Sequence, residues 1–480
     1  MDTRIYAVTD SHQEARNLSQ LLSGIANFEK GNNSQFLLLD CGDLFKGIYD
    51  RDLIVNAYLN FKKLYPQAQI VFALGNNDFG FNQSDFEYLK SVMSKFKKAG
   101  IEFICANLTQ DKEYSNLCPR YKIINIDDKK ILITAFCMQT SVVKRFGYEF
   151  KNEQIALQDL INSVTEKYDK IIVLNHHWYP YSKALKDFAQ SIGINIDLII
   201  GGHEHSLIVP DYQNNIFYPL AFAKTLFKIT LDNRIENITQ HNVEEFKIIP
   251  EFEKPLTEYE EQTQLYKPFA KRVLNLWKCY SEPCPLGTFI SDNMKRIAHT
   301  DIAFHSTGFS MYSLSTDDSD VITKYDFERV ICASTCIQKI EIDCAQLKKV
   351  FENATLRRMY KNNGNARFLQ CSQNIKITGV PKPEEKTYKI LQIEINGEKL
   401  LDCEANPVDV NKKFTCAIDA FIGSGEQGFE VLKDIPKIEI LDKNNEPIQL
   451  NRLLYDSLKE AQGIYPPNSE YPVFELEDVL

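Results

Sequence analysis

Short apolar runs alternate with amphipathic segments from residue 4 to about residue 230. The apolar runs are predicted to be buried strands that end in polar residues: RIYAVTD at 4–10, QFLLLDCGD at 35–43, QIVFALGN at 69–76, IEFICANL at 101–108, KIIVLNHH at 170–177 and IDLIIGGH at 196–203. The amphipathic segments between them are predicted to be helices over 13–28, 51–64, 84–99 and 151–167. This alternation is typical of an α/β domain.

The pattern changes after residue 250. The stretch 251–279 is charged and helix-like, with Pro255 and Pro268 as interruptions, and is typical of an interdomain linker. Beyond it we expect a mixture of helices and short strands, with a surface tail at the end. These elements are a helix near 286–299, strands at 322–327 (ITKYDF) and 338–343 (QKIEID), a helix over 345–360, and the tail over 465–480. The predicted domains are therefore 1–248, a linker helix over 249–280, and an α+β domain over 281–480.

Composition narrows the class of partner. A chain of 480 residues is too long for one ordinary core, and 44% hydrophobic with 25% charged residues is typical of a soluble globular protein. The formal net charge of −10 argues against long nucleic acids and anionic membranes as partners. The sequence holds no apolar run of about 18 residues and does not open like a signal peptide. Its twelve cysteines lack a repeated CxxC spacing, so we expect reduced thiols and a cytoplasmic location.

Potential metal ligands follow the predicted strands. They are Asp10 and His12 in TDSH, Asp43 in DCGD, Asn76 in LGNND, His176 in LNHH, and His203 and His205 in GGHEH. Carboxylate, imidazole and amide groups suit Mn, Fe, Zn, Co or Mg. Because the carboxyl ends of neighbouring strands meet at one edge of a sheet, these groups can gather there.

Each fragment alone has an ordinary explanation. A single DxH after a strand is more often a turn or a helix cap than a ligand pair, and GGHEH on its own fits an ordinary loop. The combination is more specific, because five of the eight histidines, His12, His176, His177, His203 and His205, lie at these strand ends. Histidines scattered through a core would not cluster in this way.

The order DxH, GD, GN, H and GGHxH resembles the calcineurin-like metallophosphoesterases. Further segments resemble the 5'-nucleotidase / UDP-sugar hydrolase family in the order of that family: ICANL at 104–108, PLGTFISDNM at 285–294, LKKVFENA at 347–354, RFLQCS at 367–372 and FIGSGEQGF at 421–429. The resemblance implies a four-layer α/β/β/α sandwich followed by an α+β C-terminal domain of the 5'-nucleotidase type.

The resemblance also implies a centre with two divalent metal ions. Asp43 would bridge the two metals. The first metal would also be held by Asp10, His12 and His205, and the second by Asn76, His176 and His203. In such a centre a metal-bridging hydroxide attacks phosphorus. Asp43 and Asn77 are the residues to which the resemblance assigns a place in catalysis.

Asn77 departs from the family motif GNHEFD. The family's histidine and the aspartate three residues later are replaced here by Asn77 and Gly80. Asparagine cannot deliver a proton at neutral pH, although its amide can donate a hydrogen bond. The stretch GNND is similar to the GNCD of small phosphodiesterases in the same superfamily, which favours diesters or activated substrates.

The predicted second domain departs as well. Ser310 in HSTGFS stands where the family places an arginine on the substrate, and Ala333 replaces one of two base-stacking aromatics. Phe429 keeps the other, as a stacking surface or as a core residue. Arg357 or Arg358 is a candidate to replace the missing charge, and His177 is a candidate for substrate contact.

The sequence therefore predicts a metal-dependent phosphoester hydrolase, a phosphoric monoester hydrolase of the 5'-nucleotidase type acting on a small nucleotide-like substrate. Two alternatives stay open. One is a phosphodiesterase acting on cyclic or dinucleotide diesters, and the other is a non-catalytic metal-binding protein whose C-terminal domain binds a ligand or partner. The sequence identifies neither the metals nor the oligomeric state.

Overall fold

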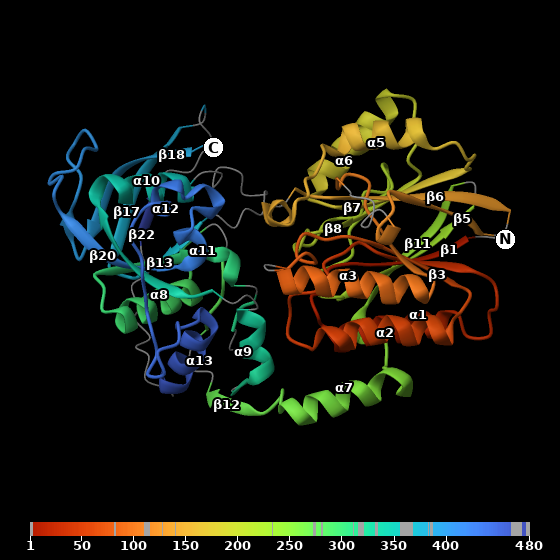
Figure 1. Cartoon of the computed structure of the whole chain (residues 1–480), viewed down its shortest axis with the longest axis horizontal. Helices are drawn as coiled ribbons and strands as arrows, with labels where there is room; N and C mark the ends of the chain where they lie inside the picture. Colours follow the sequence, from red (N-terminus) through yellow and green to blue (C-terminus); the bar gives the residue numbers. More distant parts are fainter. Residues whose placement is uncertain are drawn as a thin grey trace. The chain divides into compact units, whose positions relative to one another are not determined.

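The computed structural model describes residues 3–80, 83–109, 116–126, 128–139, 141–232, 234–271, 275–279, 282–310, 312–314, 321–331, 335–355, 368–382, 384, 387–461 and 473–476. The chain divides into two compact units, Met1–Gln262 and Thr263–Leu480 (Figure 1). Every metal ligand predicted from the sequence lies in the first unit.

The first unit contains a six-stranded sheet in the order β11-β10-β1-β2-β3-β4. Its strands are β1 (Thr3–Val8), β2 (Phe36–Asp40), β3 (Ala68–Ala73), β4 (Ile101–Ile104), β10 (Thr225–Leu231) and β11 (Ile235–Asn242). Strands β1 to β4 are parallel, whereas β10 runs antiparallel to both β1 and β11. The carboxyl ends of β1, β2 and β3 therefore meet at one edge.

A second sheet in this unit has the order β5-β6-β7-β8-β9. Its strands are β5 (Tyr121–Ile126), β6 (Lys129–Cys137), β7 (Lys170–His176), β8 (Leu198–Gly202) and β9 (Ile216–Phe217). Strands β6 to β9 are parallel and β5 is antiparallel to β6. This sheet likewise brings the carboxyl ends of β7 and β8 together.

The two sheets pack face to face through alternate residues of their strands. Ile5 and Ala7 of β1, for example, share one buried cluster with Ile172 and Leu174 of β7. Helices cover the outer faces: α1 (Ala15–Phe28), α2 (Arg51–Leu64) and α3 (Gln83–Lys98) on the first sheet, and α5 (Glu153–Ser163) and α6 (Tyr179–Ser191) on the second (Figure 1). The predicted four-layer α/β/β/α sandwich is confirmed.

Local sequence signals explain where these helices begin. The Asp50 carboxylate accepts a hydrogen bond from the Asp52 N–H at the start of α2. The Asn152 side chain accepts from the N–H groups of Gln154 and Ile155 at the start of α5. Such N-caps satisfy backbone donors that have no partner within the helix.

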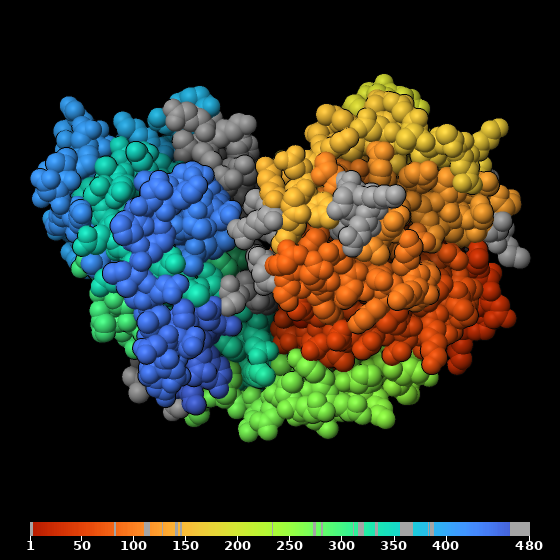
Figure 2. Space-filling model, in the orientation of Figure 1, coloured from red at the N-terminus to blue at the C-terminus, as the bar shows by residue number. Residues whose placement is uncertain are grey.

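Helix α7 (Pro250–Thr263) ends far short of the predicted linker helix over 249–280. Arg16 pairs with Glu260, with Nη2 2.6 Å from Oε2, and the Tyr49 hydroxyl donates to Oε1 of the same carboxylate. Figure 2 shows this green helix along the red and orange surface of the first unit. The chain then forms strand β12 (Pro268–Lys271), whereas Pro255, predicted to interrupt the helix, lies inside α7.

The second unit contains a five-stranded sheet, β16-β13-β20-β15-β21, a four-stranded sheet, β19-β18-β17-β22, and the pair β12-β14. Its remaining strands are β13 (Ile302–Ser306), β14 (Val321–Thr323), β15 (Ile337–Asp343), β16 (Leu369–Cys371), β17 (Ile375–Lys382), β18 (Thr387–Ile395), β19 (Glu398–Lys399), β20 (Lys413–Asp419), β21 (Ile438–Glu439) and β22 (Val473–Leu476). Its helices are α8 (Pro285–Ala298), α9 (Lys324–Val330), α10 (Cys344–Thr355), α11 (Ala420–Gly423), α12 (Glu430–Lys433) and α13 (Leu450–Ala461). Short 3₁₀ turns lie in the first unit at η1 (Ser141–Phe146) and η2 (Val243–Glu245), and in the second unit at η3 (Thr307–Phe309) and η5 (Glu426–Gly428).

Two predictions for this unit are wrong. The stretch 322–327 is not one strand, because the Thr323 hydroxyl accepts from the Asp326 N–H while the Asp326 carboxylate accepts from the Thr323 N–H. This reciprocal pair begins helix α9. The predicted surface tail over 465–480 contains β22, which pairs in parallel with β17.

Among the residues that the structure describes, no helix is long and apolar enough to cross a lipid bilayer.

Candidate metal centre

Strand register in the first sheet aligns the loops that carry the candidate ligands. Val8 of β1 pairs with Asp40 of β2, and Asp40 pairs with Phe72 of β3. Asp10 comes two residues after Val8, Asp43 comes three after Asp40, and Asn76 comes four after Phe72. In the second sheet His176 pairs with Gly202, so His203 comes directly after the same row.

Glycines allow the loops to come close together. A Cβ atom on Gly75 would lie 2.1 Å from the Asp43 Oδ1, and one on Gly202 would lie 2.8 Å from the His176 Nδ1. Both distances are too short for real contacts, so side chains at these positions would push the ligand loops apart. The glycines of GNND and GGHEH are therefore required by the geometry of the site.

The first group of ligands consists of Asp10, His12, Asp43 and His205, whose donor atoms all lie within 4.8 Å of one another. The His12 Nε2 lies 3.1 Å from the His205 Nε2 and 3.6 Å from the Asp43 Oδ2. The His205 Nε2 is 3.5 Å from the Asp10 Oδ1. Two imidazole and two carboxylate donors at this spacing are a suitable set for a divalent cation.

The second group consists of Asp43, His176 and His203, again within 4.8 Å of one another. The His176 Nε2 lies 3.3 Å from the Asp43 Oδ2 and 3.2 Å from the Asn76 Oδ1, which brings the amide oxygen to the same group. The His203 Nδ1 is buried and has no hydrogen-bond partner among the described residues, which leaves this nitrogen available to a cation. The structure thus brings all seven predicted ligands together, and Asp43 belongs to both groups.

Backbone strain is concentrated at the same residues. Asp10, His12, Asp43 and His203 have φ values of 46°, 44°, 56° and 72°, in the left-handed region that residues other than glycine rarely adopt. Hydrogen bonds hold two of the loops against each other: the Asp10 N–H donates to the Gly42 carbonyl and the His12 N–H donates to the Asp43 carbonyl. Strain of this kind is typical of functional sites.

Burial and charge set the protonation of the site. Burial lowers the pKa of His12 to about 4 and that of His203 to about 3, which favours the neutral imidazole that can bind a metal. Burial also opposes the charged forms of Asp43 and His176, but their mutual attraction outweighs it. The pKa of Asp43 is therefore held well below its usual value, and the pKa of His176 is raised to about 10.

Asp78 organises the site without being a ligand. Its buried carboxylate accepts from four backbone N–H groups of two loops, at 2.8 Å from Gly75, 3.0 Å from Asp43, 2.7 Å from Leu44 and 3.3 Å from Phe45. It therefore ties the DCGD loop to the GNND loop. The sequence prediction did not include Asp78, although an acid three residues after a glycine is a pattern typical of local side-chain to backbone hydrogen bonds.

Asn77 is fixed against the shared carboxylate. Its backbone N–H donates to the Asp43 Oδ1 at 2.8 Å, and its side-chain Nδ2 donates to the Asp43 Oδ2 at 2.6 Å. Its Oδ1 accepts from the Lys46 Nζ at 3.2 Å. The residue at the family's histidine position is thus a hydrogen-bonding amide beside Asp43.

His177 lies outside both ligand groups. Its ring stacks on Tyr181, with centroids 3.7 Å apart, and its Nδ1 accepts from the Trp178 N–H. Burial lowers the pKa of His177 to about 3. The side chain packs onto α6, so the structure gives no support to a contact between His177 and a substrate at the metals.

Of the substrate residues predicted in the second unit, the structure describes Phe429 and Ser310. Phe429 has 0% exposed area and belongs to a hydrophobic core cluster, so its ring is a core residue here and not an open stacking surface. Ser310 is buried as well. Arg357, Arg358 and Ala333 lie outside the described residues.

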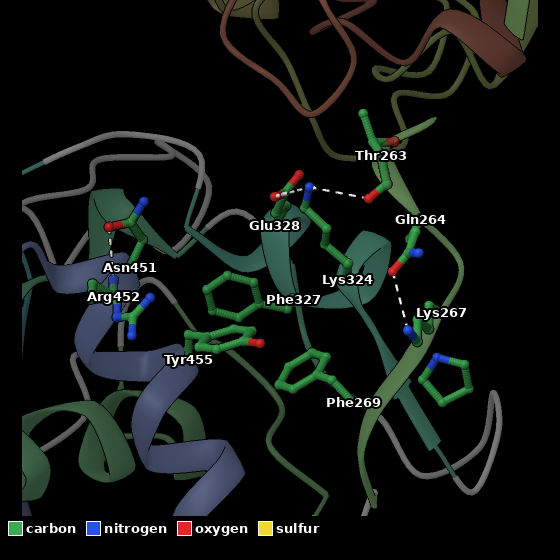
Figure 3. A pocket seen from close by; sticks show the side chains of 11 residues that line it. Thr263, Gln264, Lys267, Phe269, Lys324, Phe327, Glu328, Asn451, Arg452 and Tyr455 are labelled. Carbon is green, nitrogen blue, oxygen red and sulfur yellow. Dashed lines mark hydrogen bonds and ion pairs between the residues drawn. The ribbon is translucent and has the colours of Figure 1, made fainter. Parts of the chain in front are cut away.

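The second unit contains a hollow of about 460 Å³. Neither Phe429 nor Ser310 lines it. Figure 3 shows Phe269, Phe327 and Tyr455 close together among its lining side chains. Phe269 stacks on Tyr455, with centroids 4.7 Å apart, so these two rings already cover each other's faces. Lys324 at its rim pairs with Glu328 at 3.6 Å.

Metal binding should stabilise the protein. Because a cation held by these ligands binds the folded state, a concentration of Mn²⁺ 100 times the dissociation constant should add about 2.7 kcal/mol per site. For a unit of this size we expect the thermal midpoint to rise by about 5–10 °C per site, measured by differential scanning fluorimetry with and without EDTA. His177→Ala, next to a ligand but outside both groups, should show the same shift. No shift with Mn²⁺, Zn²⁺, Co²⁺ or Mg²⁺ would contradict the site.

Two family models match the chain. The calcineurin-like phosphoesterase model matches residues 3–207, and the model of the 5'-nucleotidase C-terminal domain matches residues 261–434. The first match contains all seven residues of the two ligand groups.

Individual proteins resemble the chain over nearly its whole length. A 5'-nucleotidase-related protein of Glossina morsitans morsitans is 22% identical over 512 residues, covering 94% of this chain and 87% of that protein. The 5'-nucleotidase of Bos taurus is 20% identical over 498 residues, covering 90% of this chain and 83% of that protein.

Among solved structures, the 5'-nucleotidase precursor of Thermus thermophilus superposes with a TM-score of 0.76 at 16% identity, covering both chains completely. At this identity the likeness establishes a shared fold. The two family matches together show that the chain belongs to the calcineurin-like phosphoesterases of the 5'-nucleotidase family, with a phosphoesterase domain followed by a 5'-nucleotidase C-terminal domain.

Proposed function

We propose that this protein is a metal-dependent phosphoester hydrolase that acts on a small nucleotide-like phosphoester. The observation that carries the proposal is the position of Asp43, whose carboxylate belongs to both ligand groups. A carboxylate shared in this way is the feature that a two-metal hydrolytic site requires. The nucleotide-like substrate is inferred from the family relationship.

Two divalent cations at these ligands would supply a water of lowered pKa and would neutralise charge on the phosphoryl group. The chain itself fixes the ligands. The Cys41 carbonyl lies 2.7 Å from the His176 Nδ1, so this ring nitrogen donates and Nε2, 3.3 Å from the Asp43 Oδ2, is the atom that would bind a cation. The two hydrogen bonds from Asn77 orient the Asp43 carboxylate in the same way.

Asn77 limits the range of substrates. Its side-chain amide already donates one hydrogen bond to Asp43, and an amide has no proton to give to a departing oxygen. Loss of general acid catalysis costs about two to four powers of ten in rate, most of all for leaving groups of high pKa. We infer that the protein prefers activated monoesters, with diesters as the second candidate because the same motif lacks the acid.

Paired substrates with one leaving group separate these possibilities. We expect Mn²⁺-loaded protein to release p-nitrophenol from p-nitrophenyl phosphate faster than from bis(p-nitrophenyl) phosphate, and to release phosphate slowly from a nucleoside 5'-monophosphate. A higher rate on the diester would favour the phosphodiesterase. Full metal occupancy without turnover on any of the three would favour a non-catalytic metal-binding protein.

Asn77→His tests the missing acid. We expect this variant to raise the rate on the nucleoside monophosphate by about tenfold, below the usual range for general acid catalysis. The gain is limited because Gly80 has a φ of 66° and packs against Asp85, so the family's orienting aspartate is absent and would be strained there. The rate on p-nitrophenyl phosphate, whose leaving group needs no proton, serves as the internal control. A lower rate on both substrates would show that Asn77 has a role of its own.

The cytoplasmic location expected from the sequence stays a prediction.

A further inference from the structure

Lys46 is held in place by residues next to the metal ligands. Its backbone has a φ of 77°, and the N–H groups of Lys46 and Gly47 both donate to the Gln13 Oε1, at 2.7 and 2.9 Å. A Cβ atom on Gly47 would lie 1.6 Å from the His12 carbonyl oxygen, so the loop has no room to shift toward that strand end. The position of the Lys46 backbone is therefore coupled to the DxH loop.

The ammonium group of Lys46 is close to the shared carboxylate. The Lys46 Nζ donates to the Asn77 Oδ1 at 3.2 Å, and the Asn77 Nδ2 donates to the Asp43 Oδ2 at 2.6 Å. One amide side chain therefore separates a cation from the carboxylate on which both ligand groups converge. Asp43 is fully buried, whereas Lys46 and Asn77 are both partly exposed, so this cation is accessible on the solvent side of the site.

The family's histidine has two separable uses at this position, to give a proton and to stabilise negative charge. The Asn77 amide has no proton to give and carries no charge, and its Nδ2 already donates to the Asp43 carboxylate. A lysine ammonium hydrogen-bonded to that amide brings back the positive charge without the acid. Hydrogen bonds from ammonium to phosphate oxygens are among the stronger ones in proteins.

We propose that Lys46 is a catalytic residue that donates a hydrogen bond from Nζ to a terminal oxygen of the substrate's phosphoryl group. The role is electrostatic: no proton is transferred and no covalent bond forms. The inference rests on the proposed hydrolase function for its place in catalysis. It adds a preference for dianionic phosphoryl groups, as in monoesters and inorganic phosphate, over the single negative charge of a diester.

A purely structural role for Lys46 makes a different prediction. If the side chain only held Asn77 against Asp43, its loss would weaken the binding of dianions and monoanions alike, and would lower the metal content. If Lys46 contacts phosphate directly, its loss weakens binding of the dianion more than binding of the monoanion, because the lost attraction scales with the charge of the ligand.

The test measures binding separately from turnover. Mn²⁺-loaded wild type, Lys46→Met and Lys46→Arg are titrated by calorimetry with inorganic phosphate at pH 8 and with dimethyl phosphate, and metal content is measured by mass spectrometry. We expect Lys46→Met to weaken the binding of phosphate by about tenfold and that of dimethyl phosphate by less than about twofold, with two metals retained. Lys46→Arg should recover most of the phosphate affinity. Lys63→Met removes the same charge from the exposed end of α2 and should change nothing.

Equal affinity of Lys46→Met and wild type for phosphate would overturn the inference, and so would equal losses for both anions or a loss of metal. These variants keep a non-glycine residue with a partly exposed side chain, so folding should be preserved. The two proposals fail separately. If wild type hydrolyses phosphoesters while Lys46→Met keeps its phosphate affinity, only the Lys46 inference is wrong. If phosphate affinity depends on Lys46 but no phosphoester is hydrolysed, the hydrolase proposal is wrong, and only the phosphate-binding part of the Lys46 proposal stands.

Discussion

Replacing Asp43 with asparagine is expected to abolish both metal binding and hydrolysis. The carboxylate contacts His12 at 3.6 Å and His176 at 3.3 Å, so both ligand groups lose their common anion at once. Because bound metals contribute several kcal/mol to stabilising the transition state, we expect kcat/KM to fall by at least about 1000-fold. Metal content, measured on the same samples, should fall from two ions per chain to none.

Asp40→Asn, at the last residue of strand β2, is a matched control. Asp40 is as buried as Asp43 and lies three residues before it, but burial raises its pKa to about 8, so it is mostly neutral at pH 7. An amide therefore resembles the native form of the side chain, and Asp40→Asn should keep both metals. An Asp43→Asn protein with two metals and near-normal activity would refute the two-metal assignment.

Asp78→Ala should cause the largest loss of stability among the site residues. The substitution removes the acceptor of four backbone N–H groups, and each buried donor left without a partner costs about 1–3 kcal/mol. Water can reach part of the vacated space, so we expect the free energy of unfolding to fall by about 3–5 kcal/mol, measured by urea denaturation in EDTA.

Two further variants make this measurement specific. Asp78→Asn keeps one acceptor oxygen of the same shape and should lose about half as much. Asp85→Ala removes an acid of the neighbouring helix α3 whose ion pair with Arg51 is partly exposed, and should cost less than about 1 kcal/mol. Equal effects of Asp78→Ala and Asp85→Ala would show that the four hydrogen bonds contribute little.

The metal ligands could be predicted because the information is local. Each ligand follows an apolar run, and parallel pairing brings the ends of such runs to one edge whatever the rest of the fold contains. The pairing of Val8 with Asp40 and of His176 with Gly202 is the physical reason why seven residues spread over the first 205 positions come together.

Features that depend on tertiary approach were not predictable in the same way. The carboxylate of Asp78 matters because two loops meet around it, and the Lys46 side chain matters because Asn77 lies beside it. Phe429 looked equally suitable for stacking and for the core until its burial was known. The strand at Val473–Leu476 depends on a partner strand almost 100 residues earlier, which no local pattern indicates.

The span of the ligand set has a consequence for synthesis of the protein. His12 and His205 meet although 193 residues separate them, and β1 acquires its antiparallel partner only when Thr225–Leu231 has been made. A growing chain that has been made through the end of β7 carries five of the seven ligands, Asp10, His12, Asp43, Asn76 and His176, but lacks both histidines of GGHEH. Since long-range contacts form late in folding, metal capture should be a late event, after the first unit has been completed.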